Sequence, residues 1–332
     1  MLAHRIATAW MPLARSSEVA DRPVRVEAAD QLLVLFRNGV GDAIALDARC
    51  PHRGTLLDLG DIVDGTIRCP YHGWRFGDHG VCVDIPSLQG SVPKGCHTTA
   101  WQTTERDGLV WGSADPAADA DAVPGFVDAT TIGPGMRLIV GDPIDWATSA
   151  GRVVENMLDV GHFPFVHTTT FGCPEAEVVA PHTPQAQDGV LTCDIDVTTA
   201  NPETPEGPLY PELGPTIVLH YRYEVRLPYR VTLAFTFPDG MHRVLHEVVT
   251  PTSASTCRMY WALGVDERLG SMEEDELAFA RSVFAEDRPI VESQPPGVPL
   301  HPSAEVHVPA DRLAVAYRRA LREWGVPEEA RI

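Results

Sequence analysis

Two short pairs of potential metal ligands stand close together in the first third of the sequence. In the stretch CPHRGTLLDLGDIVDGTIRCPYHGW, residues 50–74, Cys50 precedes His52 and Cys69 precedes His72, with sixteen residues between the pairs. Structural zinc sites usually pair like with like, as Cys-x-x-Cys followed by His-x-x-x-His. Each pair here is mixed, so zinc is the weaker interpretation.

A mixed pair from each of two loops suits a Rieske [2Fe-2S] centre. One iron of that centre takes two thiolates and the other takes two imidazoles. Two loops that approach from one side can each give one ligand to each iron. Gly54 and Gly73 follow the two pairs and let the backbone pass close to a cluster. The stretch therefore predicts a Rieske cluster.

The stretch resembles the cluster-binding loops of the Rieske protein family. The resemblance implies that Cys50 and Cys69 bind one iron and that His52 and His72 bind the other.

The chain departs from the respiratory branch of that family at three positions. That branch has a disulfide between its loops where this chain has Thr55 and Tyr71, and a serine that hydrogen-bonds a cluster sulfide where this chain has Trp74. Because fewer hydrogen bonds to sulfur stabilise the reduced state less, we expect a potential toward the low end of the roughly −150 to +300 mV Rieske range. A cluster of this kind donates electrons readily, as an oxygenase requires.

A second group of chemistry-bearing residues lies in ENMLDVGHFPFVH, residues 155–167. Asn156, Asp159 and His162 are spaced by three and would share one face of a helix. His167 comes five residues after His162, and Pro164 between them disfavours a regular helix, so the chain must bend if the imidazoles are to meet. The alternative is two histidines on a kinked amphipathic helix with no metal.

A carboxylate interrupts the apolar stripe of the helix expected over 273–292. The stripe consists of Leu277, Ala280, Phe284, Ile290 and Val291. Asp287 falls within it, and an unpaired buried carboxylate costs several kcal/mol, so it should be paired or bound to metal. With His162 and His167 it would complete the two-histidine, one-carboxylate triad of non-haem Fe(II) oxygenases. A salt bridge from Asp287 to Arg281 or Arg288 is the competing interpretation.

Together, these motifs resemble the catalytic subunit of Rieske non-haem iron oxygenases, in the group of vanillate and dicamba demethylases. The resemblance covers most of the chain. It implies that His162, His167 and Asp287 hold a mononuclear Fe(II) and that Asp159 is the acid linking the two metal centres. EDRPIVES, residues 286–293, matches the family's late carboxylate segment.

The elements that must position these residues predict an α+β protein. Residues 1–114 show short β-runs between turns and predict an all-β Rieske domain, residues 115–135 predict a linker that begins with DPAADADAVPG, and 136–332 predict the catalytic domain. Five strand-length segments predict an antiparallel sheet there: 190–199, 216–227, 229–237, 243–250 and 256–265. Helices are expected near 150–162, over 273–292 and at the C-terminus. The resemblance implies a helix-grip fold around an apolar cavity.

Composition narrows the class of protein. The formal net charge of −20 argues against nucleic acid as a partner, because a duplex binds cationic side chains. The sequence has neither a long apolar span nor the apolar core of a secretory signal, so a cytoplasmic location is expected. The remaining cysteines, Cys82, Cys96, Cys173, Cys193 and Cys257, lack metal-like spacing and are expected in cores.

The reaction follows from the two centres. Dioxygen activation needs two electrons, and the Rieske domain would store one of them. GVGDAI, residues 39–44, has Ile44 where a dinucleotide-binding motif needs its last glycine. A separate NAD(P)H-dependent reductase, directly or through a ferredoxin, must therefore supply electrons. The expected activity is hydroxylation or O- or N-demethylation of an aromatic or natural-product substrate.

Two alternatives stay open at this point. One is an arene cis-dihydroxylating dioxygenase, and the other is a Rieske redox or ligand-carrier protein without mononuclear iron. The resemblance also implies a homotrimer in which the Rieske domain of one chain meets the catalytic domain of the next.

Overall fold

The chain forms two compact units. The computed structural model describes residues 4–204, 207–301, 303–328 and 332. Unit 1 is Met1–Phe126 together with Thr250–Ser253, and unit 2 is Val127–Val249 together with Ala254–Ile332. The boundary between Phe126 and Val127 lies inside the segment 115–135, which the sequence suggested as a linker.

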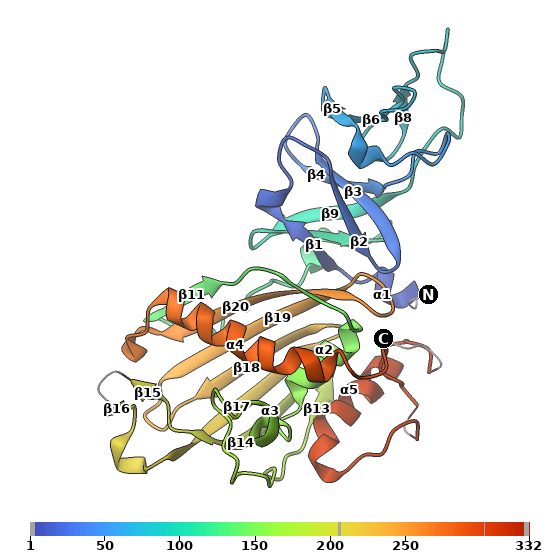
Figure 1. Ribbon diagram of the computed structural model, residues 1–332. Helices are drawn as coiled ribbons and strands as arrows, with labels where there is room; N and C mark the ends of the chain where they lie inside the picture. Colours follow the sequence, from blue (N-terminus) through green and yellow to red (C-terminus); the bar gives the residue numbers. More distant parts are fainter. Residues whose placement is uncertain (1–3, 205–206, 302, 329–331) are drawn as a thin grey trace. The chain divides into compact units, whose positions relative to one another are not determined.

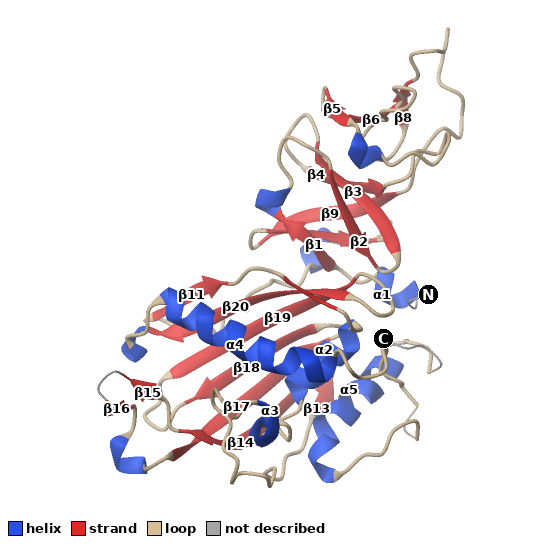
Figure 2. Cartoon of the chain, in the orientation of Figure 1, coloured by secondary structure: helices blue, strands red, loops and turns tan. Residues whose placement is uncertain are grey.

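Unit 1 is built mainly from strands (Figures 1 and 2). Its larger antiparallel sheet has the order β1–β10–β9–β4–β3–β2. Its smaller sheet has the order β5–β6–β7–β8. The elements are α1 (His4–Ala7), β1 (Met11–Arg15), β2 (Val24–Ala28), β3 (Gln31–Arg37), β4 (Ala43–Asp47), β5 (Asp61–Val63), β6 (Thr66–Arg68), β7 (Arg75–Phe76), β8 (Cys82–Asp84), β9 (Ala100–Arg106) and β10 (Leu109–Ser113).

The two Cys/His loops are anchored on one hydrophobic core of unit 1. Val34 and Phe36 of β3 and Leu46 of β4 pack in one cluster with residues of the small sheet. Cys50 and Cys69 belong to this same cluster and are each 2% exposed. The first pair follows β4 and the second lies between β6 and β7, so packing between the two sheets fixes both loops.

Unit 2 contains a large antiparallel sheet with helices on one face (Figures 1 and 2). Its order is β11–β20–β19–β18–β17–β14–β13, and β12 also pairs with β20. The elements are β11 (Met136–Val140), β12 (Ile144–Trp146), β13 (Gln185–Gln187), β14 (Val190–Ala200), β15 (Glu203–Thr204), β16 (Gly207–Pro208), β17 (Thr216–Arg226), β18 (Arg230–Thr236), β19 (His242–Pro251), β20 (Cys257–Asp266), α2 (Ala150–Leu158), α3 (Phe163–Val166), α4 (Glu273–Val291) and α5 (Arg312–Glu323).

The five predicted strand segments form β14 and β17 to β20. The sequence missed β11, β12 and β13. These lie at the margins of the sheet, and β12 and β13 are three residues long, too short for an alternating pattern to be visible. Long alternating strands are predictable because one of their faces is buried, as the alternation of buried and exposed residues along β14 and β17 shows.

The helix expected near 150–162 is shorter than predicted. α2 ends at Leu158, and Asp159 has extended backbone, φ −98° and ψ 121°. The Asp159 Oδ1 accepts a hydrogen bond from the Gly161 amide at 2.7 Å, which closes a turn in place of another helical turn. Pro164 sits in the first turn of α3, so a new helix begins there, as the predicted bend required.

A buried ionic network ties α2 to α5. Glu155 of α2 bonds Arg318 of α5, with a Nη2–Oε2 distance of 2.9 Å. Glu305 bonds both Arg318 and Arg152 of α2 at 2.6 Å. Arg318 and Arg152 are each 7% exposed along the side chain. The network fixes α2, the helix that leads to His162 and His167.

We expect Arg318→Ala to lower the free energy of unfolding of unit 2 by about 3 kcal/mol, because it leaves the buried Glu155 with only the longer 3.4 Å contact to Arg152. Urea unfolding followed by circular dichroism measures the loss. Arg319→Ala is the matched control, since Arg319 pairs with Glu323 on the surface and such pairs contribute about 0–1 kcal/mol. Equal effects of the two substitutions would contradict the role of the network.

Candidate metal centres and substrate cavity

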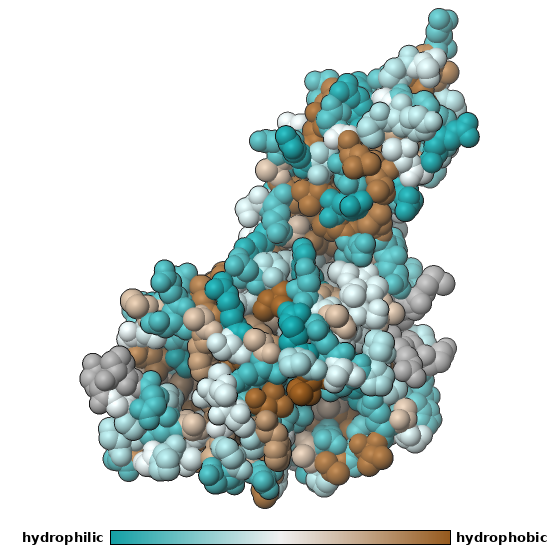
Figure 3. Space-filling model, in the orientation of Figure 1, coloured by the Kyte–Doolittle hydropathy of each residue, from teal (hydrophilic) through white to brown (hydrophobic). Residues whose placement is uncertain are grey.

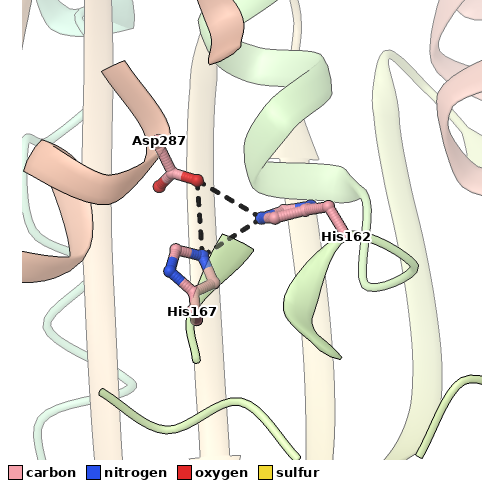
Figure 4. A group of neighbouring side chains, drawn as sticks. All are labelled: His162, His167 and Asp287. Carbon is pink, nitrogen blue, oxygen red and sulfur yellow. Dashed lines mark hydrogen bonds and ion pairs between the residues drawn. The ribbon is translucent and has the colours of Figure 1, made fainter. Parts of the chain in front are cut away.

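Three side chains of unit 2 direct one ligand atom each at a common point (Figure 4). The Nε2 atoms of His162 and His167 are 3.2 Å apart. Asp287 Oδ1 lies 3.4 Å from His162 Nε2 and 3.3 Å from His167 Nε2. This arrangement of two imidazoles and one carboxylate is the donor set of a mononuclear non-haem iron site.

The short helix α3 brings the two imidazoles together. His162 is its N-terminal cap and His167 its C-terminal cap, so they flank a single turn. A regular helix over the same residues would turn side chains five positions apart away from one another. The break at Leu158 and the restart at Pro164 therefore create the pair.

Asp287 reaches the imidazoles from the buried side of α4. That side consists of Glu276, Ala280, Phe284, Asp287 and Val291. Ile290 is 50% exposed, so its predicted place on the apolar stripe was wrong. One residue before Val291, it points away from the buried side by about 100° of helical rotation.

The salt bridge considered for Asp287 is not formed. Arg281 pairs with Asp142, and Arg288 pairs with Glu292. Among the described residues, Asp287 Oδ1 and His162 Nδ1 have no hydrogen-bond partner of good geometry. An orphaned carboxylate oxygen at the point where two imidazole nitrogens converge fits a cation at that point.

The charges of the site stabilise one another in the metal-free chain. Burial alone would lower the pKa of His162, but Asp159 and Asp287 raise it to about 9. Burial raises the pKa of Asp287, yet His162 and His167 lower it to about 2. The 3.4 Å separation is long for a hydrogen bond, so charge attraction is the main cause of both shifts.

Glu286 is a site residue that sequence reasoning missed. Its Oε2 lies 2.9 Å from His167 Nδ1 and accepts a hydrogen bond from the Thr170 hydroxyl at 2.7 Å, while its Oε1 accepts one from Thr169. Burial raises the pKa of Glu286, but these donors bring it below its usual value. A carboxylate there is placed to accept the Nδ1 proton of His167, which would leave Nε2 as the ligand atom for a metal. The only sequence signal was its position beside Asp287.

Asp159 stands next to the free ring nitrogen of the other histidine. Its Oδ2 is 3.5 Å from His162 Nδ1, and its side chain is 43% exposed. Its other oxygen, Oδ1, accepts a hydrogen bond from the Gly161 amide. Asn156 lines the cavity beside the site.

The two loops of unit 1 have the same local structure. The Cys50 carbonyl accepts a hydrogen bond from the Gly54 amide, and the Cys69 carbonyl accepts one from the Gly73 amide. Both glycines have φ +74°, a value that L side chains rarely adopt. Each loop thereby turns its Cys inward and its His outward.

The two loops bring their histidines together and their cysteines together. The rings of His52 and His72 are 4.5 Å apart, and His52 stacks on Trp74 at 4.6 Å. Burial raises the pKa of Cys50 to about 11, and the neighbouring Cys69 thiol adds to the shift. A bound iron would instead hold both sulfurs as thiolates. The donor set fits a [2Fe-2S] cluster.

The cysteines are free thiols, so the described part of the chain has no inter-loop disulfide. Of the five assigned to cores, Cys82, Cys173, Cys193 and Cys257 are buried, whereas Cys96 is only partly buried.

An apolar cavity of about 830 Å³ adjoins the three converging side chains. Its volume is within the ordinary range for small-molecule sites. The sheet gives it Leu219, Tyr221, Leu233, Phe235 and Leu245, and α4 gives it Phe279, Val283 and Phe284. His162, His167 and Asp287 also line it. On the face in Figure 3, apolar side chains show between α4 and α3 within a mostly hydrophilic surface.

Comparison with known proteins agrees with both sites. Residues 9–99 match the Rieske [2Fe-2S] domain, and residues 146–326 match the vanillate O-demethylase oxygenase C-terminal domain. The chain therefore belongs to the Rieske non-haem iron oxygenases, in the group whose catalytic domain is that of vanillate O-demethylase oxygenase. The predicted family, α+β fold class, oxygenase activity and two kinds of iron cofactor are confirmed. An oxygenase component of this kind works with a reductase partner.

Relatives align over nearly the whole chain. Methylxanthine N1-demethylase NdmA of Pseudomonas putida is 29% identical, over 95% of this chain and 88% of that protein. Its structure with caffeine superposes with a TM-score of 0.80 at 26% identity, covering 96% of this chain and 91% of that one. Dicamba monooxygenase bound to dicamba shares the fold, with a TM-score of 0.77 over 98% of both chains at 21% identity. No helix among the described residues is long and apolar enough to span a membrane.

We expect His162 in the metal-free chain to keep its proton until about pH 9, because Asp159 and Asp287 stabilise the imidazolium. Nuclear magnetic resonance of chain labelled with ¹⁵N-histidine measures this titration. His246 is the internal control, since burial and the charge of Arg230 lower its pKa to about 4. A His162 titration near its ordinary value of about 6.5 would contradict the charged pair.

Proposed function

We propose that this chain removes O- or N-methyl groups from aromatic or heteroaromatic substrates, or hydroxylates them, as the oxygenase component of a Rieske monooxygenase. The observation that carries the proposal is the convergence of His162, His167 and Asp287 at the wall of an apolar cavity. One atom of dioxygen would enter a C–H bond and the other would leave as water. Hydroxylation of a methyl group on O or N gives a product that loses formaldehyde.

The proposed ligands of the cluster are Cys50 and Cys69 on one iron and His52 and His72 on the other. The inward thiols and outward imidazoles support this division. It would leave the imidazole-bound iron nearer the surface, where electrons can arrive from a partner.

The proposed ligands of the mononuclear iron are His162, His167 and Asp287. When bound, Fe(II) in a triad of this kind supplies dioxygen activation at its open positions. Glu286 and Asp159 would orient the imidazoles through their Nδ1 atoms, as carboxylates commonly do for metal-bound histidines. The apolar walls would hold the substrate and exclude water from the reacting atoms.

Demethylation or monohydroxylation is favoured over cis-dihydroxylation by the relatives, whose names describe demethylases of methylxanthines and of dicamba. The cavity offers aromatic walls from Tyr221, Phe235 and Phe284, which suit a flat ring. A cytoplasmic location stays an expectation of the sequence.

Electrons would come from an NAD(P)H-dependent reductase, directly or through a ferredoxin. We propose that a homotrimer brings His72 of one chain to Asp159 of the next, so that Asp159 bridges the centres. Two features support this: His72 is exposed, and Asp159 is partly exposed while lying beside His162.

The function is tested by incubating the iron-loaded chain with a reductase, NADH and a panel of methoxy- and N-methyl-substituted rings. The expected result is formaldehyde release with oxygen consumption matched to NADH oxidation. Binding of these compounds without any turnover, in a chain that holds two irons rather than three after iron loading, would favour the ligand-carrier alternative.

We expect Asp287→Ala to lose about one iron in three and all turnover while keeping the Rieske electron paramagnetic resonance signal, because the triad loses its anionic ligand. Cys69→Ser is the converse control and should lose the cluster signal while keeping the mononuclear iron. Iron analysis and spectroscopy measure both. Full iron content in Asp287→Ala would place the third ligand elsewhere.

We expect Asp159→Asn to keep both metal centres but to transfer electrons about 10–100-fold more slowly, a loss typical of orienting carboxylates beside metal ligands. Single-turnover oxidation of the reduced cluster measures the rate.

Mixing inactive His72→Cys and Asp287→Ala chains under conditions of subunit exchange should restore part of the activity. No recovery despite demonstrated exchange would rule out the path between chains.

A further inference from the structure

A second buried carboxyl group, Glu247, faces the same cavity. Side chains alternate along a strand, and Arg243, Leu245 and Glu247 of β19 all line the cavity. Glu247 lies opposite Val231 of the neighbouring strand β18 and is 3% exposed. Its position is therefore on the sheet wall, among apolar side chains.

Glu247 differs from the other buried acidic residues of unit 2 in having no partner. Glu276 bonds Arg243 at 2.6 Å, and Glu155 bonds Arg318 at 2.9 Å. For the Glu247 side chain, no hydrogen bond or ion pair is found within the described part of the chain. Because the side chain lines the cavity, its carboxyl group is available to a ligand there.

The physical state of Glu247 follows from its surroundings. Burial, with a smaller effect of the charge on Asp287, raises the pKa of Glu247 to about 8. Burial at 3% exposure, without a cationic partner among the described residues, favours the protonated form of this side chain. A carboxylic acid offers one donor and one acceptor side by side, which match the carbonyl and N–H of an amide or lactam.

The other charges on the cavity disfavour an anionic ligand. The acidic side chains that line it include Glu203, Asp275 and Glu276. Within the described lining, Arg243 is the guanidinium; its Nη2 is paired with Glu276, and its buried Nε has no hydrogen-bond partner among the described residues. A carboxylate in the cavity would meet like charge and would have to share the one guanidinium of the described lining with Glu276.

We propose that Glu247 anchors the substrate and that this chain takes neutral aromatic or heteroaromatic amides and lactams while rejecting aromatic carboxylates. The inference rests on the proposed function in one respect, because it takes the cavity as the substrate site. It adds a specificity-determining residue and a substrate class to that function.

The test compares two ligands of the same shape and different charge. The iron-loaded chain is titrated anaerobically in a calorimeter with para-methoxybenzamide and para-methoxybenzoate, and with the larger pair methoxynaphthamide and methoxynaphthoate. Loss of a hydrogen bond together with burial of an unpaired charge should weaken binding at least about tenfold. We therefore expect each amide to bind at least about tenfold more tightly than its carboxylate.

Variants of Glu247 test whether the preference for amides over carboxylates depends on this residue. Glu247→Gln keeps a donor and an acceptor and should retain the preference, whereas Glu247→Leu should abolish it while raising the melting temperature. If Glu247 had a merely structural role, the same change to leucine would lower the melting temperature of the protein. Thr199→Val is the matched control, because Thr199 is a buried polar residue that lines the same cavity and should leave the preference unchanged.

The outcomes separate this inference from the proposed function. Equal or tighter binding of the carboxylates, binding of no amide, or an unchanged preference in Glu247→Leu would overturn the role of Glu247. Tight amide binding that depends on Glu247 but supports no oxygen consumption would instead overturn the proposed activity and leave the anchor in place.

Discussion

A carboxylate on the buried side of α4 constrains the whole of unit 2. Asp287 is 5% exposed and stands in line with Ala280, Phe284 and Val291, where an apolar side chain would ordinarily be favoured. Its charge needs a partner, and the protonated His162 at one end of α3 provides it in the metal-free chain, with His167 at the other end of α3 beside it. The short α3 and the break after α2 exist because those imidazoles must reach one point.

The supporting residues follow from the same requirement. An imidazole that presents Nε2 to the centre must satisfy Nδ1 elsewhere, and Glu286 lies 2.9 Å from Nδ1 of His167. Thr169 and Thr170 in turn bond Glu286. Asp159 stands in the corresponding place for His162, at a longer distance. The more exposed of these two carboxylates is the one assigned to electron transfer, where contact with another chain is needed.

The ligand loops of unit 1 are positioned mainly by local structure. These loops are repeated turns, each closed by a glycine amide on a cysteine carbonyl and held by a core that includes both cysteines. The geometry of each loop is set by residues close in sequence. The packing of the two sheets only brings the two loops next to each other. The catalytic unit instead draws its site from α3 and α4, which are separated by more than a hundred residues.

The sequence by itself determined what is local. Three local features could be predicted: the mixed Cys/His pairs, the bend at Pro164 and the position of Asp287 within an apolar stripe. They could be predicted because ligand spacing and side-chain period are short-range properties. The long strands β14 and β17 to β20 were predictable for the same reason. The sequence did not predict the short strands β11, β12 and β13 or the end of α2 at Leu158.

Only the tertiary structure decided which distant side chains share an environment. Glu286 and Glu247 are two acidic residues whose sequence contexts distinguish neither from a surface residue. Folding placed Glu286 against His167, with three donors, and placed Glu247 on the cavity wall with none among the described residues. Burial and partnership arise from the packing of segments far apart in the chain, so the walls and charge of the cavity are fixed only when the sheet and helices meet.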